Sequence, residues 1–454
     1  MTYILIFFLL VSNVVYCQNR WQKIYHDEID APMKYIIESY DHGYLLSGKY
    51  GANYSKYNWL IKTDINGEVL WEKTIGNGIN AIVLTEMGKN DDGAIYACGS
   101  SSHKDPYGDP IIIKLDSCGE KEWCKIFHTP DHQDFAQHIC ITPDGGCAVT
   151  LNYTGPNLWT DRICLAKLNS YGDLIWKQCY NSPDSLMGNE EDHDLILTPD
   201  SGFLISGHCY YTDTVAILAW LHPYYIKTDS LGNFEWETIV HKYTDTGDGQ
   251  GWTTVISPDS QYYYSSISHY QRNPYGSSPA LLKMDMLGNV ISILDLVEPN
   301  DIGKIVDALF ISDSTIAASA SWGSYEEAHP KAVIIDTLGN IINEQNLLDN
   351  EYMSRVRRTF DDKLLFYTHT YLDNIEQFDA YLFKLDLNLE DDTLYTFPFQ
   401  YDTLCLYPIT SDTIVQDDCE LIVGFQEPIN TDPEEPEHLL IYPNPASDLI
   451  HCQL

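Results

Sequence analysis

Apolar and polar positions along the chain follow a pattern that returns every 50–60 residues. Each copy has a short apolar run that ends in Lys-x-Asp, with a glycine three residues later and often a tryptophan four residues after the glycine. The clearest copies are residues 59–71 and 113–123. The Asp-type position is taken by Asp64, Asp116, Asn169, Asp229, Asp285, Asp336 and Asp386. A repeat of this length indicates a propeller or a solenoid.

A second phrase precedes each Asp-type position by about 23 residues and predicts a tight turn. It reads Asp41-His-Gly43 in the first copy and Pro199-Asp-Ser-Gly202 in the fourth, sequences that supply the backbone angles of hairpins. An apolar run lies on each side of this turn. The Lys-x-Asp run forms a third strand and the tryptophan segment a fourth, so each repeat predicts one antiparallel four-stranded blade.

The sequence therefore predicts an all-β fold, a seven-bladed β-propeller of four-stranded antiparallel blades over residues 18–396. An open solenoid is the alternative. Residues 20–25 resemble an isolated fourth strand. We expect them to complete the last blade, whose own fourth strand is poorly defined near Thr393, and so to close the ring.

The repeated residues are explained by structure rather than by chemistry, because seven copies of one motif would require seven active sites. We expect the Asp and Gly to build the turn and the Trp to pack between blades. The stem of the repeated Lys is expected to cover an apolar edge. None of these residues is assigned a catalytic role.

Alternating strand direction places the loops between the second and third strands on the same face as the connections between blades. These loops are rich in aromatic residues, and loops on a rigid scaffold commonly carry function. Aromatic side chains there suit a glycan, a peptide or a protein surface, although packing of the loops against one another explains them equally well. The expected ligand-contacting residues are Tyr54, Tyr107, Trp159, Tyr210, Tyr211, Tyr275, Trp322, Tyr325 and Tyr371.

Charge excludes one class of partner. The chain has 26 basic and 66 acidic residues and a net charge of −40, whereas nucleic-acid binding needs clustered Lys and Arg. Asp245 and Asp248, beside several glycines, are candidate Ca²⁺ ligands without the EF-hand spacing. The histidines between His128 and His138, and the acidic segment 190–194, fit solvated polar loops better than metal sites.

No established catalytic motif is present: the sequence contains no Gly-x-Ser-x-Gly, no His-Glu-x-x-His and no phosphate-binding loop. It therefore assigns no catalytic residue, no metal site and no cofactor beyond the possible Ca²⁺. A pair of carboxylates for glycoside chemistry depends on the fold rather than on sequence spacing. A carbohydrate-active enzyme thus stays open as a function.

Residues 3–16 form an apolar run that is too short to span a bilayer comfortably. Residues 1–17 therefore predict a secretory signal peptide, cleaved near Cys17 or Gln18. Tyr16 is too bulky for the residue that precedes a lipidated cysteine. No other segment predicts a transmembrane span. Eleven cysteines remain, which suits disulfides in an oxidising compartment. The hairpins favour the pairs Cys118–Cys124, Cys140–Cys147 and Cys164–Cys179.

The repeat pattern stops after about residue 396. Residues 397–426 predict a small β-type connector stapled by Cys405 and Cys419, and residues 427–438 an acidic, Pro-rich linker. Residues 439–454 contain Tyr442-Pro443-Asn444-Pro445. This motif resembles the start of the C-terminal sorting domain of the type IX secretion system.

The resemblance covers about fifteen residues, so we expect a truncated domain or a defective export signal. It implies the secretion machinery as a partner, and passage through the periplasm to the outer surface or the medium. The repeats are similar to propeller repeats of such exported proteins. They are also faintly similar to pyrroloquinoline-quinone-type repeats, but lack the adjacent cysteine pair of those enzymes.

These features favour an exported, monomeric propeller that acts as a non-enzymatic binding or adhesion module through its aromatic loop face. The alternative is a secreted carbohydrate-active enzyme, a hydrolase or lyase, that uses carboxylates on the same face. A surface-layer component without a discrete pocket is a third hypothesis. Clustered acidic groups with perturbed pKa values in the central mouth would favour the enzyme.

Overall fold

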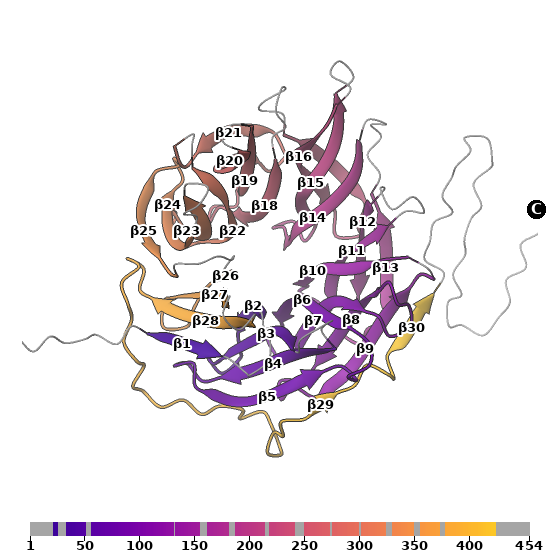
Figure 1. Cartoon of the computed structure of the whole chain (residues 1–454). Helices are drawn as coiled ribbons and strands as arrows, with labels where there is room; N and C mark the ends of the chain where they lie inside the picture. The colour runs from indigo at the N-terminus through magenta and orange to yellow at the C-terminus, as the bar shows by residue number, and fades with distance from the viewer. Residues whose placement is uncertain are drawn as a thin grey trace, which may run out of the picture.

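The computed structural model describes residues 21–25, 33–50, 56–130, 132–154, 161–180, 187–213, 218–240, 249–272, 275–298, 301–323, 329–348, 355–372 and 377–423. Seven antiparallel sheets are arranged radially around a central axis (Figure 1). The prediction of an all-β, seven-bladed propeller is therefore confirmed. No helix able to span a bilayer occurs in these ranges.

Each blade runs from an inner strand at the axis to an outer strand at the rim. Blade 1 contains β2 (Met33–Glu38), β3 (Tyr44–Tyr50), β4 (Tyr57–Thr63) and β5 (Val69–Ile75); blade 2 contains β6 (Ile82–Lys89), β7 (Ile95–Ser101), β8 (Asp109–Leu115) and β9 (Lys121–His128); and blade 3 contains β10 (Phe135–Ile141), β11 (Cys147–Thr154), β12 (Asp161–Leu168) and β13 (Leu174–Cys179). Blade 4 contains β14 (Met187–Leu197), β15 (Phe203–Asp213), β16 (Leu218–Thr228) and β17 (Phe234–Ile239), and blade 5 contains β18 (Gln250–Ile256), β19 (Tyr262–Arg272), β20 (Tyr275–Asp285) and β21 (Val290–Asp295). Blade 6 contains β22 (Ile302–Phe310), β23 (Thr315–Gly323), β24 (His329–Asp336) and β25 (Ile341–Asn346), and blade 7 contains β26 (Arg355–Arg358), β27 (Leu364–Leu372), β28 (Gln377–Leu385) and β1 (Gln22–Tyr25).

The ring is closed by the N-terminal strand. β1 pairs antiparallel with β28, with Ile24 opposite Tyr381, and becomes the outer strand of blade 7. The predicted role of this isolated fourth strand is confirmed. Closure from both ends of the domain leaves only short edges exposed to pairing with other chains.

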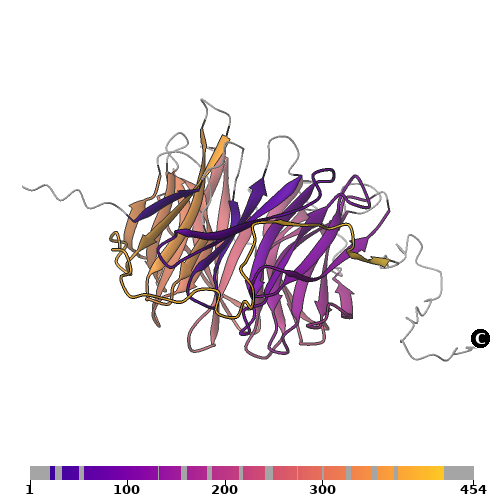
Figure 2. The same ribbon diagram turned by 90° about the horizontal axis from the view of Figure 1, so that it is seen from below.

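We name the two faces by their connections. The loop face carries the loops between second and third strands and the connections between blades. The turn face carries the two tight turns of each blade, and Figure 2 shows both rims from the side. On the turn face, Asp64 accepts hydrogen bonds at 2.8 Å from the backbone N–H groups of Asn66 and Glu68. Gly67 follows at a φ of +77°, which favours glycine.

The repeated Trp packs between blades, as predicted. A Cβ placed on Gly119, in the turn of blade 2, would lie 2.8 Å from the ring of Trp71 in blade 1. Trp21, the residue before β1, lies 3.2 Å from a Cβ placed on Gly67, so the closing segment continues the pattern. Hydrophobic clusters fill the spaces between blades; one contains Leu60 of blade 1 and Leu84 of blade 2.

The prediction for the repeated Lys was incomplete. In blades 1, 3, 4 and 7 its ammonium group forms an ion pair with the aspartate of the first turn in the same blade. In blades 2 and 6 the partner is a glutamate of the fourth-strand segment. Lys62 binds Asp41 at 2.9 Å and Lys227 binds Asp200 at 2.8 Å. The lysine therefore connects the strand before the second turn to the first turn. Its charged group contributes to the fold as well as its apolar stem.

After β28 the chain becomes a peripheral strap, residues 393–423. The strap runs along the outside of blades 7, 1 and 2 (Figures 1 and 2). Two short strands in it, β29 (Thr413–Ile414) and β30 (Glu420–Val423), add in parallel to β5 and β9. Blades 1 and 2 thereby become five-stranded.

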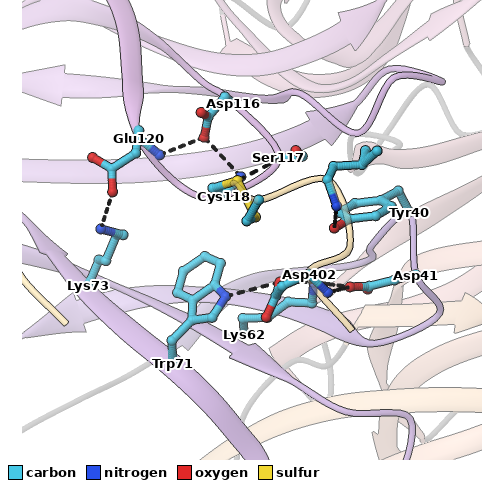
Figure 3. The surroundings of a disulfide bond; sticks show 12 residues. Tyr40, Asp41, Lys62, Trp71, Lys73, Asp116, Ser117, Cys118, Glu120 and Asp402 are labelled. Carbon is cyan, nitrogen blue, oxygen red and sulfur yellow. Dashed lines mark hydrogen bonds and ion pairs between the residues drawn. A yellow bond between two sulfur atoms is a disulfide. The ribbon is translucent and has the colours of Figure 1, made fainter. Parts of the chain in front are cut away.

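Two disulfides attach the strap to blade 2, Cys118–Cys405 and Cys124–Cys419. Around the first, Asp402 accepts hydrogen bonds from Lys62 and from the indole of Trp71, both at 3.3 Å (Figure 3). The expected staple between Cys405 and Cys419 is therefore wrong, because each of these cysteines pairs with the propeller.

Two of the three predicted hairpin disulfides are also wrong. Cys118 lies in a turn and Cys124 four residues into extended β9, and about 3.3 Å per residue places them too far apart. In blade 3, Cys140 is opposite Ala148 while Cys147 is opposite Ile141, so their side chains point to opposite faces. Cys164–Cys179 is confirmed, since these residues are directly opposite on β12 and β13.

Candidate ligand-binding site at the propeller axis

The seven inner strands surround the axis (Figure 1). Six of them, β2, β6, β10, β14, β18 and β22, have register shifts against the second strand of their blade. A bulge of this kind changes the direction of a side chain and is common beside functional sites. The inner strands therefore present several polar residues close to the axis.

A ring of polar contacts crosses from blade to blade around the axis. The Tyr35 hydroxyl of blade 1 donates to Glu86 of blade 2 at 2.6 Å. Glu86 bonds the ring of His138 in blade 3 at 2.7 Å, and His138 Nε2 lies 4.0 Å from a carboxylate oxygen of Asp192 in blade 4.

The ring continues through the remaining blades. Asp194 of blade 4 accepts a hydrogen bond from the Thr253 hydroxyl of blade 5 at 3.1 Å. Asp307 of blade 6 pairs with Arg357 of blade 7 at 2.5 Å, and this guanidinium lies 4.8 Å above the ring of Tyr35 in blade 1. Between blades 5 and 6 the contacts are of another kind: the Ser266 hydroxyl donates to the carbonyl of Ile305 at 2.9 Å, and Lys304 Nζ lies 3.8 Å over the Trp252 ring.

The carboxylates of this ring connect neighbouring inner strands. Three of them accept a hydrogen bond from a backbone N–H of the next blade: Glu86 from Ile139 at 3.2 Å and Asp194 from Thr254 at 2.8 Å. Asp307 does the same with Val356 at 3.0 Å. These acidic groups are thus partnered within the protein and stabilise the contacts between blades.

These contacts and the burial of the groups determine the pKa values of the axial carboxyl and imidazole groups. Burial opposes the charge of Glu86, but the neighbouring His138 holds the pKa of this carboxyl below its ordinary value. Burial also opposes the charge of His138, and the Glu86 carboxylate still raises the pKa of this imidazole. Burial raises the pKa of Asp194 to about 6, so this group titrates near neutral pH.

Three cations near the loop face, Lys34, Lys304 and Arg355, form no ion pair within 4.0 Å with a carboxylate of the described residues. Burial opposes the charge of Arg355, but the nearby carboxylates of Asp307 and Glu86 still raise its pKa. The three cations come from blades 1, 6 and 7, and each lies near the start of an inner strand. Arg355 donates to the carbonyl of Val306 at 3.4 Å. The three positive groups are therefore clustered at one end of the axis.

Desolvation and repulsion act on this cationic cluster. Burial, with the positive charges of Lys49 and Arg355, lowers the pKa of Lys34. Burial lowers the pKa of Lys304 to about 8. Placing like charges together costs free energy, and such shifts are typical of functional sites.

A ladder of aromatic rings extends from the cluster toward solvent. Lys304 Nζ lies 3.8 Å over Trp252, whose ring stacks on His193 at 4.6 Å. The rings of His193 and His208 stack at 5.0 Å and share a hydrogen bond of 2.9 Å. Tyr210 packs edge-on against His208 at 6.1 Å and is exposed.

Burial keeps both histidines of the ladder neutral. It lowers the pKa of His208 to about 4. For His193, burial and then the positive charges of His208 and His138 lower the pKa well below its ordinary value. The ladder is thus an uncharged aromatic surface that ends at the Lys304 ammonium.

The structure brings only part of the predicted aromatic set to this site. Tyr210 joins the ladder, and Tyr107 is exposed in the loop between β7 and β8. Trp322 was predicted to contact ligand, but it is 3% exposed in the core between blades 5 and 6, because its position in β23 faces the neighbouring blade. Tyr211, Tyr275 and Tyr371 lie in β15, β20 and β27.

The remaining predicted site residues lie outside the described residues: Tyr54, Trp159, Tyr325, Asp245, Asp248 and the motif Tyr442, Pro443, Asn444 and Pro445.

Sequence reasoning missed most of the axial residues. His138 and the segment 190–194 were interpreted as polar loops, but they lie in strands β10 and β14. One signal would have found them, because every blade has a polar residue six positions before the aspartate of its first turn. These residues are Tyr35, Glu86, His138, Asp194, Thr253, Asp307 and Arg355.

No protein-family model matches the sequence, and no curated protein is significantly similar to it. Among solved structures, the chain is similar to an ulvan lyase of a polysaccharide lyase family, with a TM-score of 0.53 and 9% identity over 81% of this chain and 96% of that one. It is also similar to the Kuenenia stuttgartiensis hydrazine synthase, with a TM-score of 0.52 and 12% identity over 81% and 98% of the two chains. A Pseudomonas aeruginosa periplasmic gluconolactonase has a TM-score of 0.43 and 11% identity over 80% and 98%. At these identities the similarities show the propeller fold alone.

Proposed function

We propose that this protein is an exported binding module that recognises a negatively charged glycan at the loop-face end of its axis. The observation that carries the proposal is the cluster of Lys34, Lys304 and Arg355, three cations that form no direct ion pair with a carboxylate of the described residues. A chain with a net charge of −40 has abundant acidic residues to neutralise them. An anionic ligand would supply countercharge to Lys34 and Lys304 and would add to that of Asp307 and Glu86 near Arg355.

The overall charge sets the conditions for binding. A strongly negative protein repels a polyanion at long range, so recognition depends on contacts inside the cationic cluster. Added salt screens the long-range repulsion as well as the short-range attraction. We expect binding to decline with salt less steeply than for a protein that presents a broad basic surface.

The aromatic ladder gives the proposed site its sugar-binding character. Tyr210, the exposed end of the ladder, offers a ring against which the apolar face of a pyranose can pack, while Trp252 and His193 stack on each other behind it. The adjacent cations would bind a carboxylate or sulfate on the same sugar. Sugar acids and sulfated glycans combine these two properties. The ulvan lyase of similar fold has been solved with a bound -[GlcA(1-4)Rha3S]- segment, a ligand of this chemical class.

A carbohydrate-active enzyme at the same site is the second candidate. The observation in its favour is that burial raises the pKa of Asp194 to about 6 although the nearby His138 opposes this shift. Against it, both the backbone N–H of Thr254 and the Thr253 hydroxyl already engage Asp194. A binding function requires only the groups that have no such partner.

Export is part of the proposal. The predicted signal peptide, residues 1–17, and the Tyr442–Pro445 motif lie outside the described residues. The three disulfides of the described chain suit an oxidising environment outside the cytoplasm. Mass spectrometry of the protein recovered from the culture medium of its host would test this part, by showing whether the first 17 residues are removed.

A glycan array that contains acidic glycans and their neutral counterparts tests the binding function. The full chain is expected to retain acidic glycans, and the double variant Lys304→Gln/Arg355→Gln is expected to lose roughly tenfold or more in affinity. Lys89→Gln is the matched control, because Lys89 lies in inner strand β6 but at the turn-face end. Release of shorter products from a bound glycan would instead favour the enzyme.

A further inference from the structure

The repeated lysine of blade 5 differs from its counterparts. In blades 1, 3, 4 and 7 this lysine pairs with the aspartate of the first turn, at distances of 2.6–2.9 Å. Lys283 of blade 5 forms no ion pair with a carboxylate among the described residues. Its ammonium lies 3.7 Å over the ring of Tyr262 and 5.3 Å over that of Tyr264.

A change in the first turn explains the difference. In blade 4 the N–H of Thr198 donates to the carbonyl of Gly202, closing the turn, whereas in blade 5 Ser257 donates to Tyr262, one residue further along. The longer turn places Tyr262 where blades 1, 3 and 4 have glycine. A Cβ on Gly202 would lie 2.6 Å from Lys227 Nζ.

The ammonium group needs the space beside this position to reach the aspartate. A side chain there does not by itself block the ion pair, because blade 7 has Lys363 at this position and Lys384 still binds Asp361 at 2.6 Å. Blade 5 differs in its longer turn and in the aromatic ring of Tyr262. In blade 5 the Tyr262 ring occupies this space and holds Lys283 by a cation–π contact. Asp259, the aspartate of this turn, binds Ser257 and the N–H of Gln261 instead. The displaced lysine is left beside a surface pocket.

The pocket lies on the turn face between blades 5 and 6 and has a volume of about 440 Å³. Pockets of this size hold small ligands. Its walls come from the first turn of blade 5, the neighbouring strands β19 and β20, and two turns of blade 6. The lining residues are Ser257, Pro258, Asp259, Tyr262, Tyr264, Lys283, Asp313 and Thr337.

The mixed charges of the lining favour an uncharged ligand. The carboxylates of Asp259 and Asp313 repel an anion, and the ammonium of Lys283 repels a metal ion. The remaining groups are two phenol rings, two hydroxyls and hydrogen-bonding groups of both kinds. A neutral sugar matches this set, because its hydroxyls donate to carboxylates and accept from an ammonium while its C–H face packs on an aromatic ring.

We propose that the pocket between blades 5 and 6 is a second carbohydrate site, which binds a neutral sugar unit on the face opposite the axial cations. The proposal rests on the blade 5 turn and not on the axial site. Two sites on opposite faces would allow one protein to bridge two glycan chains.

Saturation-transfer NMR on the full chain tests the proposal, with methyl glycosides of glucose, galactose, mannose and N-acetylglucosamine as probes. At least one glycoside is expected to receive saturation from the wild-type protein. Lys283→Met and Tyr262→Gly are each expected to reduce its affinity roughly tenfold, the value of one charge-assisted contact or of one aromatic platform. Lys331→Met, a partly buried lysine of blade 6 paired with Glu344, is the matched control and is expected to bind normally.

The axial variant Lys304→Gln/Arg355→Gln separates the two proposals, because it is expected to lose acidic glycans and to keep the neutral glycoside. Lys283→Met removes no ion pair among the described residues, so it keeps the test valid if Tyr262→Gly fails to fold. The proposal is overturned if no glycoside receives saturation, or if both blade 5 variants bind as the wild type does.

Discussion

Two sets of positions in the same blades contrast sharply. The turn aspartate, glycine and repeated lysine are nearly the same from blade to blade, and each bonds or packs within the propeller wall. The position six residues before the first-turn aspartate is polar in every blade, yet it carries Tyr35, Glu86, His138, Asp194, Thr253, Asp307 and Arg355 in turn. Positions that carry the same residue type in most blades build the scaffold. The axial position is polar in every blade but its residue type varies, and this variation gives the axis its specific chemistry.

The first way to sharpen this contrast is to remove a scaffold lysine. Lys384 is fully buried and pairs with Asp361 at 2.6 Å, so Lys384→Met leaves an uncompensated carboxylate. We expect a loss of about 3–5 kcal/mol in the free energy of unfolding. Denaturant titration measures it, with Lys304→Met as the axial comparison, for which we expect less than about 1 kcal/mol. Equal losses in both variants would break the contrast.

The strap gives the next largest effect. Cys419→Ala with Cys124→Ala removes a disulfide that spans 295 residues of sequence. We expect a loss of about 2–4 kcal/mol, because the bond restricts the unfolded chain. Thermal unfolding measures the change, and the hairpin pair Cys164→Ala/Cys179→Ala, which spans 15 residues, is expected to lose less. A larger effect from the hairpin pair would contradict the view that the strap holds blade 2.

The Glu86–His138 pair predicts a pH-dependent contribution to stability. The lowered pKa of Glu86 means that its contribution is present above about pH 4.5, its ordinary value, and is lost as pH falls through the folded pKa. The raised pKa of His138 means that its contribution is present below about pH 6.5 and is lost as pH rises through the folded pKa. The pair therefore stabilises most between about pH 4.5 and 6.5, by about 1–3 kcal/mol.

Glu86→Gln is expected to remove this dependence. Melting temperature followed from pH 4 to 8 checks it, and Glu120→Gln, an exposed carboxylate on the rim, serves as the control. An unchanged pH profile in Glu86→Gln would show that the pair does not act as described.

The smallest expected effect is a change with pH in the affinity of the axial site for an anionic glycan. Asp194 gains a negative charge as pH rises through about 6, and Lys304 loses its positive charge through about 8. Both changes weaken the binding of an anion, so affinity is expected to fall in two steps between pH 5 and 9. Lys304→Gln is expected to remove the upper step only. Affinity that rises with pH would exclude an anionic ligand at this end of the axis.

The sequence predicted the repeating scaffold well and the site poorly, for one physical reason. Asp64 and Gly67 recur because every blade needs the same turn, so periodicity reveals them. The axial residues share only a position, and their types differ, so no repeated motif marks them. The disulfides to the strap join positions 287 and 295 residues apart, and nothing local in the sequence specifies that pairing. Trp322 was misassigned because its place in β23 buries it between blades.

The most direct test of the account is a calorimetric titration of the full chain with a glucuronate-containing tetrasaccharide and with the same tetrasaccharide after reduction of its carboxyl groups to alcohols. We predict that the acidic form binds at least roughly tenfold more tightly, and that Lys304→Gln/Arg355→Gln abolishes the difference while Lys89→Gln preserves it. Equal binding of the two forms, or a difference that survives in the axial variant, would contradict recognition of an anionic glycan by the axial cations.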